Sequence, residues 1–179
     1  MPVTADATAL IALAKVRRFD VLQCLAVDIY ISPWVKQAEL RAYAGQVDAA
    51  IEAGWLHVVT PSRTLVGELI KFSGLDQGEA ESIVVASQLD HPGMRLLLDE
   101  GRAFAWIQRN PRRPPRFHVV CLGQLLHDAE DAGCIDSAEV LMRELLDSGA
   151  YRWAPSVWQH DEAWCQARSI PPLPRNPGS

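Results

Sequence analysis

A short strand turns into an apolar helix in the stretch Thr4-Ala5-Asp6-Ala7-Thr8-Ala9-Leu10-Ile11-Ala12-Leu13-Ala14-Lys15. Apolar residues recur at helical spacing from Leu10 to Ala14, and residues 2–5 form the predicted strand. In an open α/β sheet, the carboxyl ends of the strands line the ligand crevice. Asp6 is therefore expected to point at whatever the crevice binds.

Strands and helices are predicted to alternate along the rest of the chain. Further strands are expected at residues 27–31, 55–59, 96–98 and 117–121, which are rich in Val, Ile, Leu and aromatic residues. Helices are expected at residues 8–16, 19–25, 46–53, 65–72, 76–88, 101–108, 122–132, 137–147 and 155–167, and another begins at Pro33. Strands separated by helices imply an α/β fold with a central, mostly parallel sheet flanked by helices, followed by extra C-terminal helices.

One domain is expected to span residues 1–169, because 179 residues suffice for one well-buried core and are few for two. Residues 170–179 contain four prolines. Proline lacks a backbone N–H and cannot continue a helix or a central strand. This segment is therefore predicted to be a disordered tail.

The composition is that of an ordinary globular protein, with 49% hydrophobic and 22% charged residues. A net charge of -5 argues against broad electrostatic capture of nucleic acid, although a carboxylate site that binds metal adds negative charge of its own. No apolar run approaches the ~20 residues of a membrane helix, and the first residues lack the features of a signal peptide. A cytoplasmic protein is therefore expected.

The cysteines are widely spaced and form no C-x-x-C pair; they are Cys24, Cys121, Cys134 and Cys165. This spacing makes a zinc site a weak hypothesis. The four residues are predicted to be reduced, mostly buried thiols.

Carboxylates follow predicted strands or lie on intervening helices at several points in the chain. Besides Asp6, these acids are Glu39, Glu79, Glu81, Asp99 and Glu100. Magnesium and manganese prefer carboxylate oxygen as a ligand. The acids could therefore converge in space as a site for a hard cation.

Each acid also has a purely structural explanation. Asp76 and Glu79 fit the D-x-x-E capping box, in which the aspartate caps a helix and the glutamate accepts a bond from the cap's backbone N–H. The others could be helix caps (Asp6, Asp99, Glu100), a first-turn acid favoured by the helix dipole (Glu81) or a solvated helix residue (Glu39). No single acid decides between structure and chemistry.

The order of these acids resembles that of the PIN-domain nucleases. In that family an aspartate with a nearby Ser or Thr ends the first strand, a glutamate follows on an early helix, and further acids come at a mid-chain helix start and after a later strand. The chain is most similar to a branch that resembles the VapC-type toxin ribonucleases, over about residues 4–165. The motifs that carry the likeness are Leu10-Ile11-Ala12-Leu13-Ala14-Lys15, Gly78-Glu79-Ala80-Glu81, Leu98-Asp99-Glu100, Leu122-Gly123-Gln124-Leu125-Leu126 and Asp131-Ala132-Gly133-Cys134-Ile135.

This resemblance implies a Mg²⁺- or Mn²⁺-dependent endoribonuclease that hydrolyses phosphodiester bonds of single-stranded RNA, as the toxin of a toxin–antitoxin module. The catalytic residues would be Asp6, Glu39, Glu79 and Asp99. The ion would be held by Asp6, Glu79 and Asp99 with Glu81 and Glu100, and would activate a water for in-line attack. The substrate would contact Thr8, Lys15, Arg102, Arg112 and Arg113.

Two positions depart from the family pattern. Cys121 stands near where the family tends to have Thr before Leu-Gly, and Ala129 falls where a lysine is expected. The loop of residues 109–116, with four arginines, could compensate, because arginine pairs with phosphate through two parallel hydrogen bonds. Alternatively, it is a solvated loop stiffened by its prolines.

Two other functions fit the sequence. One is a catalytically degenerate PIN-like interaction module, supported by a C-terminal segment rich in the aromatic residues of interfaces, Tyr151, Trp153, Trp158 and Trp164. The other is a carboxylate-metal phosphoesterase acting on another substrate. The expected partners are RNA, a small antitoxin protein and a second copy of the chain, with no membrane.

Overall fold

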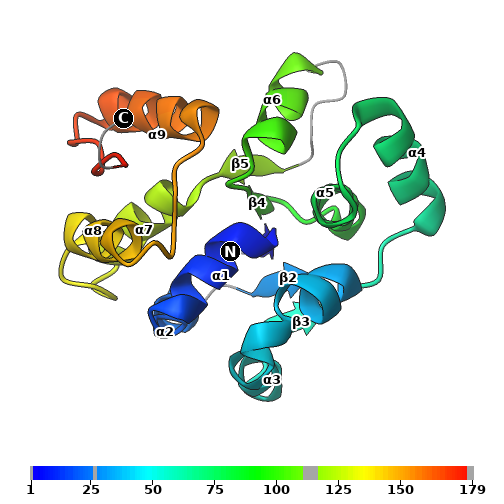
Figure 1. Cartoon of the computed structure of the whole chain (residues 1–179), viewed down its shortest axis with the longest axis horizontal. Coiled ribbons are helices and arrows are strands. Elements are labelled where there is room, and N and C mark those ends of the chain that lie inside the picture. Colours follow the sequence, from blue (N-terminus) through cyan, green and yellow to red (C-terminus); the bar gives the residue numbers. More distant parts are fainter. Residues whose placement is uncertain (1, 26–27, 111–116, 177–179) are drawn as a thin grey trace.

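The computed structural model describes residues 2–25, 28–110 and 117–176, and its centre is a five-stranded parallel sheet (Figure 1). The strands have the order β3-β2-β1-β4-β5, and every neighbouring pair is parallel. Their bounds are Val3–Ala5 (β1), Ile29–Ile31 (β2), Leu56–Val58 (β3), Arg95–Leu97 (β4) and His118–Val120 (β5). The predicted α/β fold with a parallel sheet is confirmed.

The central strand β1 is buried along its whole length although its sequence is short and polar. Val3 lies opposite Ile29 of β2 on one side and opposite Arg95 of β4 on the other. Thr4 has no exposed surface, and its hydroxyl contacts Met94 Sδ at 3.6 Å. Pairing on both edges and burial on both faces therefore outweigh the weak strand propensity of this segment.

Helices connect successive strands and cover the sheet. Their bounds are Ala7–Lys15 (α1), Asp20–Cys24 (α2), Ala44–Glu52 (α3), Arg63–Ser73 (α4), Gln77–Leu89 (α5), Gly101–Arg109 (α6), Leu122–Asp131 (α7), Ala138–Asp147 (α8) and Pro155–Arg168 (α9). The helix α5 contacts β1, β2 and β4 and is buried without interruption from Gly78 to Ala86. In Figure 1, α7, α8 and α9 gather on one side of the molecule and α4 lies on the opposite side. No helix in the described ranges is long and apolar enough to span a membrane.

The segment after β2 differs from the regular helix expected from Pro33. Ser32 does cap it, because its hydroxyl accepts a hydrogen bond from Val35 N at 3.2 Å. The chain then forms a π-helical turn over Val35–Glu39 and a 3-10 turn over Arg41–Tyr43. Since π turns shift the residues that follow them around the helix axis, this irregular turn determines where Glu39 points.

The structure corrects the prediction of four reduced thiols. Cys24 at the end of α2 and Cys134 after α7 form a disulfide with their Cα atoms 5.7 Å apart. Cys121 and Cys165 are free and buried, as predicted. The two bonded cysteines are 110 residues apart in sequence, which is why spacing alone gave no sign of their pairing.

The C-terminal segment also differs from the expected disordered tail. Residues 170–176 form no helix or strand, but Leu173 is only 4% exposed and packs into the main core. Trp153 Nε1 donates to the carbonyl of Pro174 at 2.9 Å, so the segment is also held by a hydrogen bond. The prolines exclude regular structure, yet they do not prevent packing. Residues 177–179 lie outside the described residues.

We expect Leu173→Ala to destabilise the fold by about 2 kcal/mol, because it leaves a cavity where the tail enters the core. In a chain of this size that change lowers Tm by roughly 4–8 °C. Leu65→Ala is the matched control, since Leu65 is 47% exposed and its truncation should change Tm little. Equal Tm values for the two variants in thermal unfolding would show that the tail does not contribute to the core.

Candidate active site

The acids gather at the carboxyl edge of the sheet, between β1 and β4. From β1 the chain first adds β2 and β3 on one side, and then returns to add β4 and β5 on the other. Ligands of open α/β sheets bind at such a switch point. Asp6 follows β1 directly and Asp99 lies two residues after β4, and a hydrogen bond of 3.0 Å from Asp6 N to Leu97 O ties the two strand ends together.

Asp6 is buried with little to offset its charge. It stands at the start of α1 but makes no side-chain cap bond, and it is 4% exposed. The Thr8 hydroxyl lies 3.4 Å from Asp6 Oδ2 and donates at 2.9 Å to Glu100 Oε1. Burial, together with the nearby charges of Glu39, Glu100 and Asp99, raises the pKa of Asp6 to about 8 against a lowering bond from the Ala7 backbone.

Glu79 belongs to a capping box and also faces the crevice. Its Oε2 accepts from Asp76 N at 2.8 Å, while Glu79 N donates to Asp76 Oδ1 at 2.9 Å. Its other oxygen, Oε1, is buried and accepts no hydrogen bond. Burial raises the pKa of Glu79, and the charge of Asp76 adds to this. The structural explanation of the D-x-x-E motif is therefore confirmed through Oε2, and a functional role of Glu79 stays a prediction for which Oε1 is available.

Glu39 reaches the first turn of α5 because Gly78 leaves room for it. A Cβ atom at Gly78 would stand 2.1 Å from Glu39 Oε1, far inside contact distance. Burial raises the pKa of Glu39, and the charges of Asp76, Glu100 and Glu79 raise it further. The glycine before Glu79 in the Gly-Glu-Ala-Glu motif thus permits the close approach of two glutamates.

Asp99 is held by residues from distant parts of the chain. Its Oδ1 accepts from the Tyr151 hydroxyl at 2.5 Å, and both carboxylate oxygens lie within 3.2 Å of Leu122 N at the start of α7. Burial raises the pKa of Asp99 to about 7, although these two donors oppose the rise. Asp161 and Glu100 add like charge.

These interactions define one group, which we call the acidic cluster: Asp6, Glu39, Asp76, Glu79, Asp99 and Glu100. Apart from Asp6, the charge of each member raises the pKa of at least one other, and Asp6 has its own pKa raised by three of them. From the sequence, Asp76 was predicted only to cap a helix. The structure shows that its charge also raises the pKa of Glu39 and Glu79. Glu81, also a predicted metal ligand, has different partners: its oxygens accept from Trp34 N at 3.3 Å and from Gln77 Nε2 at 2.6 Å, and its role as a ligand stays a prediction.

The predicted substrate-binding residues have different positions. Arg102 lies at the cluster, with Nη2 3.3 Å from Asp76 Oδ2 and 3.4 Å from Glu79 Oε2. Lys15 is in the last turn of α1, about 13 Å along the helix from Asp6, so the fold does not bring it to the acids. Arg112 and Arg113 lie outside the described residues. Ala129 is fully buried, so the side chain at the position expected for a lysine points into the core.

Two residues that the sequence did not mark as site residues act on Asp99, Tyr151 as a hydrogen-bond donor and Asp161 as a like charge. Tyr151 donates to Asp99 from a segment 52 residues away, and no local pattern marks such a contact. Asp161 is fully buried, and its oxygens accept from Cys121 Sγ at 3.3 Å and Cys165 Sγ at 3.9 Å. One signal for Asp161 was available, because it shares a helical face with the apolar residues Val157 and Cys165.

The chemistry of the acidic cluster suits Mg²⁺ or Mn²⁺, but its side chains are not grouped around a common point. In the described part of the chain, no three His, Cys, Asp or Glu side chains stand close enough to hold an ion as they are arranged. Asp99, Glu100 and one oxygen of Glu79 instead accept hydrogen bonds from protein donors. Carboxylate oxygens, including the unpartnered Glu79 Oε1, are the ligands that a hard cation prefers. The residues therefore fit Mg²⁺ or Mn²⁺ once some side chains rotate away from their present hydrogen-bond partners.

Comparison with known families agrees with this geometry. A family model described as a PIN domain matches residues 2–160. The match covers most of the 179 residues, and the chain therefore belongs to the PIN-domain family, whose members are in general nucleases. No curated protein and no solved structure matches the chain.

We expect the metal-free protein to lose stability as pH rises from about 4 to about 8. The folded pKa of Asp6 is about 8 and lies above its ordinary value of 3.8, so the folded state holds the proton more tightly than the unfolded chain. Stability is then greatest when the group is protonated and falls until pH passes the folded pKa.

Asp6→Asn removes the cost of ionising Asp6 in the folded state. As pH rises between these limits, its free energy of unfolding should come to exceed that of wild type by more than about 1 kcal/mol. The measurement is urea unfolding in EDTA at several pH values, with Asp147→Asn on the exposed face of α8 as the control. If the free energies of unfolding of Asp6→Asn and wild type depend on pH in the same way, the pKa of Asp6 is not raised in the folded protein.

Proposed function

We propose that this PIN domain is a divalent-metal-dependent endoribonuclease that cleaves single-stranded RNA. The observation that carries the proposal is the acidic cluster itself. Six carboxylates from four parts of the chain lie near the switch point of the sheet, and burial and mutual repulsion raise the pKa of four of them. A fold has no structural need for such a concentration of like charge, whereas a cation-dependent hydrolase does.

The contacts of the cluster support a proposed role for five of its six residues. Asp6, Glu39, Glu79 and Asp99 are the proposed catalytic acids, and Glu100 is a further ligand candidate held by Thr8. Thr8 orients Asp6 and Glu100 through one hydroxyl. These carboxylates would hold Mg²⁺ or Mn²⁺, which when bound supplies an activated water and offsets charge on the phosphodiester.

Arg102 is the proposed phosphate contact at the rim. Its side chain is 61% exposed while its guanidinium touches Asp76 and Glu79. A guanidinium presents five N–H donors, so these two contacts leave donors free for a phosphate oxygen. The positive charge of the Arg102 guanidinium also reduces the repulsion among the acids, because it lowers the pKa of Glu79.

An RNA substrate and a toxin role are proposed from the resemblance of the sequence to the branch related to the VapC-type toxin ribonucleases. A toxin would pair with a small antitoxin protein in the cytoplasm, and a homodimer is the proposed state of the isolated chain. Exposed apolar side chains that such partners could cover are Trp34, Val58, Leu65 and Phe72, the last of which is 79% exposed. A degenerate interaction module or a phosphoesterase of another substrate would keep the same fold and differ in activity.

We predict cleavage of single-stranded RNA by the purified chain with Mn²⁺ or Mg²⁺ and none in EDTA. Asp6→Asn should reduce the rate at least ~100-fold, as losses of one key electrostatic group do in other active sites. Asp147→Asn changes an exposed aspartate of the same size and should leave the rate unchanged. The measurement is the cleavage rate of a panel of labelled RNAs.

Three results would contradict the proposal in different ways. Full activity of Asp6→Asn or in EDTA would exclude the metal-carboxylate mechanism. Hydrolysis of nucleotide monophosphates in place of RNA would indicate the phosphoesterase. An inactive wild-type protein that still binds a small helical protein would indicate the interaction module.

A further inference from the structure

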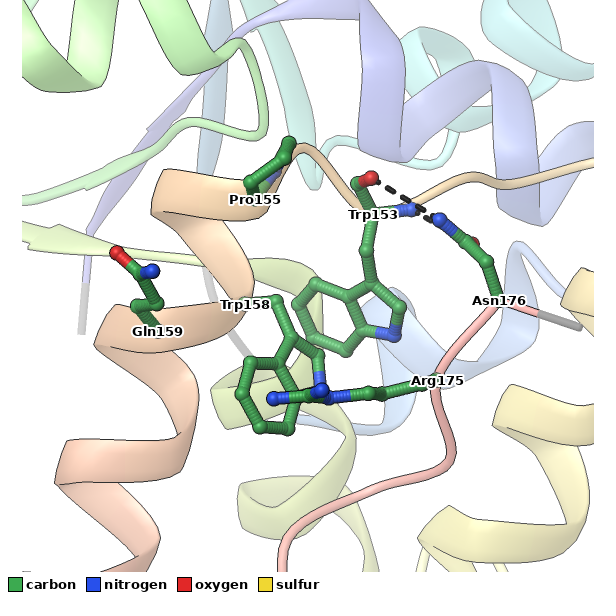
Figure 2. Close-up of a pocket in the computed structure, with 6 residues that line it drawn as sticks. All are labelled: Trp153, Pro155, Trp158, Gln159, Arg175 and Asn176. Atoms are coloured by element: carbon green, nitrogen blue, oxygen red, sulfur yellow. Dashed lines mark hydrogen bonds between the residues drawn. The ribbon is translucent and has the colours of Figure 1, made fainter. Parts of the chain in front are cut away.

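The end of the described chain is fixed onto Trp153 at the start of α9. Trp153 Nε1 donates to Pro174 O, and Asn176 exchanges two bonds of 3.1 Å with the Trp153 backbone, one accepted and one donated by its side-chain amide. Figure 2 shows this pairing beside the two indole rings. The residues on both sides of Arg175 are therefore anchored, and its backbone position is set.

Arg175 extends from this anchored segment across the ring of Trp158 (Figure 2). The centre of its guanidinium lies 3.2 Å from the ring centroid, and the residue is exposed to solvent. The structure shows no carboxylate paired with it among the described residues, in contrast to Arg95, Arg102 and Arg143, which contact acids. Arg168 likewise lies over an aromatic ring, 4.0 Å from the centroid of Trp164, and no acid of the described residues pairs with it. Arg175 differs from it in bordering a pocket.

The guanidinium borders a pocket of about 180 Å³, which we call the Arg175 pocket; it is lined by Trp153, Pro155, Trp158, Gln159, Arg175 and Asn176. Trp158 is 8% exposed, and its Nε1 is buried with no acceptor. The pocket therefore combines the cation of Arg175 with the amide of Gln159, while the indole N–H of Trp158 is too buried to reach a ligand. The guanidinium and the amide are donors for a negatively charged or oxygen-rich ligand.

The Arg175 pocket is connected to the acidic cluster by two aromatic side chains. Trp153 packs edge-on against Tyr151, with ring centroids 5.2 Å apart, and the Tyr151 hydroxyl donates to Asp99. A second connection runs through the helices: the start of α9 packs on the start of α6, where Ser156 Oγ donates to Gly101 O at 3.4 Å. Gly101 follows Glu100 directly, so the first turn of α9, which carries Pro155, Trp158 and Gln159 of the pocket, is attached next to the acids.

We propose that the Arg175 pocket binds a phosphate and its attached nucleotide of the single-stranded RNA, beside the phosphodiester at the acidic cluster. This inference rests on the proposed function. Guanidinium groups pair with phosphate through parallel N–H bonds, and single-stranded RNA is bound by aromatic and arginine planes on which bases stack. The acidic cluster repels the RNA backbone, so an unpaired cation at its flank supplies attraction that the cluster lacks.

A purely structural role predicts something different. An arginine that only covers Trp158 contributes to packing through its stem and the ring contact, and its charge would not affect RNA. Arg175→Met keeps an unbranched apolar stem over the indole and removes the charge. Arg175→Lys keeps the charge and removes the planar group. Comparison of these variants separates packing from phosphate binding.

The experiment is the binding of a fluorescein-labelled 12-nucleotide uridine RNA, by anisotropy, in EDTA and over a series of salt concentrations. Arg175→Met should raise Kd at least ~10-fold and lower the slope of log K against log salt by about 0.7, the value for one phosphate contact on a single strand. Arg175→Lys should keep the slope and recover only part of the affinity. Arg63→Ala removes an exposed arginine from α4, across the molecule in Figure 1, and should change Kd less than about 2-fold.

Several outcomes would overturn the proposal. These are an unchanged Kd for Arg175→Met, an equal loss for Arg63→Ala, or no RNA binding by wild type. A glutamate-rich peptide that binds wild type but not Arg175→Met, with equal Kd of the two proteins for RNA, would assign the pocket to a protein partner instead. Binding is measured without metal and cleavage separately with Mn²⁺, so Arg175-dependent binding by a protein that cannot cleave would contradict the proposed catalysis and leave the pocket assignment intact.

Discussion

Repulsion among buried carboxylates at the carboxyl edge of the sheet is the constraint on which the site depends. Asp6 is fixed there by the backbone bond to Leu97, and α5 brings Glu79 to the same place. The protein relieves this repulsion with Arg102, with the Thr8 hydroxyl and with the backbone N–H of Leu122. None of these neutralises Asp6, whose pKa remains raised, so the fold accepts an energetic cost that a bound cation would remove.

The C-terminal helices hold this arrangement in place. Asp99 depends on α7 for one donor and on Tyr151, between α8 and α9, for the other. Tyr151 is positioned by Trp153, and Gly123 leaves room for that indole, because a Cβ there would stand 2.7 Å from it. The extra helices are therefore the support for one of the proposed catalytic acids, and the anchored end of the chain packs on the outside of that support.

Local sequence predicted the elements well because most of them depend on local chemistry. The Asp76 and Glu79 capping box marks the start of α5, and the Ser32 cap and the apolar spacing of α1 are equally local. Four features were not predictable in this way: the π turn before Glu39, the disulfide, the Tyr151 contact and the packing of Leu173. Each depends on tertiary contacts between segments far apart in the chain. Among the acids, order along the chain identified five of the six cluster members, and it gave no sign that Glu81 is bonded to Trp34 and Gln77.

An acidic protein that acts on a polyanion has to localise its attraction. Exposed charges more than a Debye length of about 8 Å apart are largely screened at physiological salt, so the net charge matters less than the groups beside the crevice. Arg102 is partly neutralised by Asp76 and Glu79, whereas Arg175 pairs with no acid in the described chain and lies over the ring of Trp158 on an anchored backbone. A metal ion bound by the acids would reverse the sign of the electrostatic potential in the crevice. Substrate affinity would then depend on two separate cations, one bound by the carboxylates and one built into the end of the chain, and only the first would respond to EDTA.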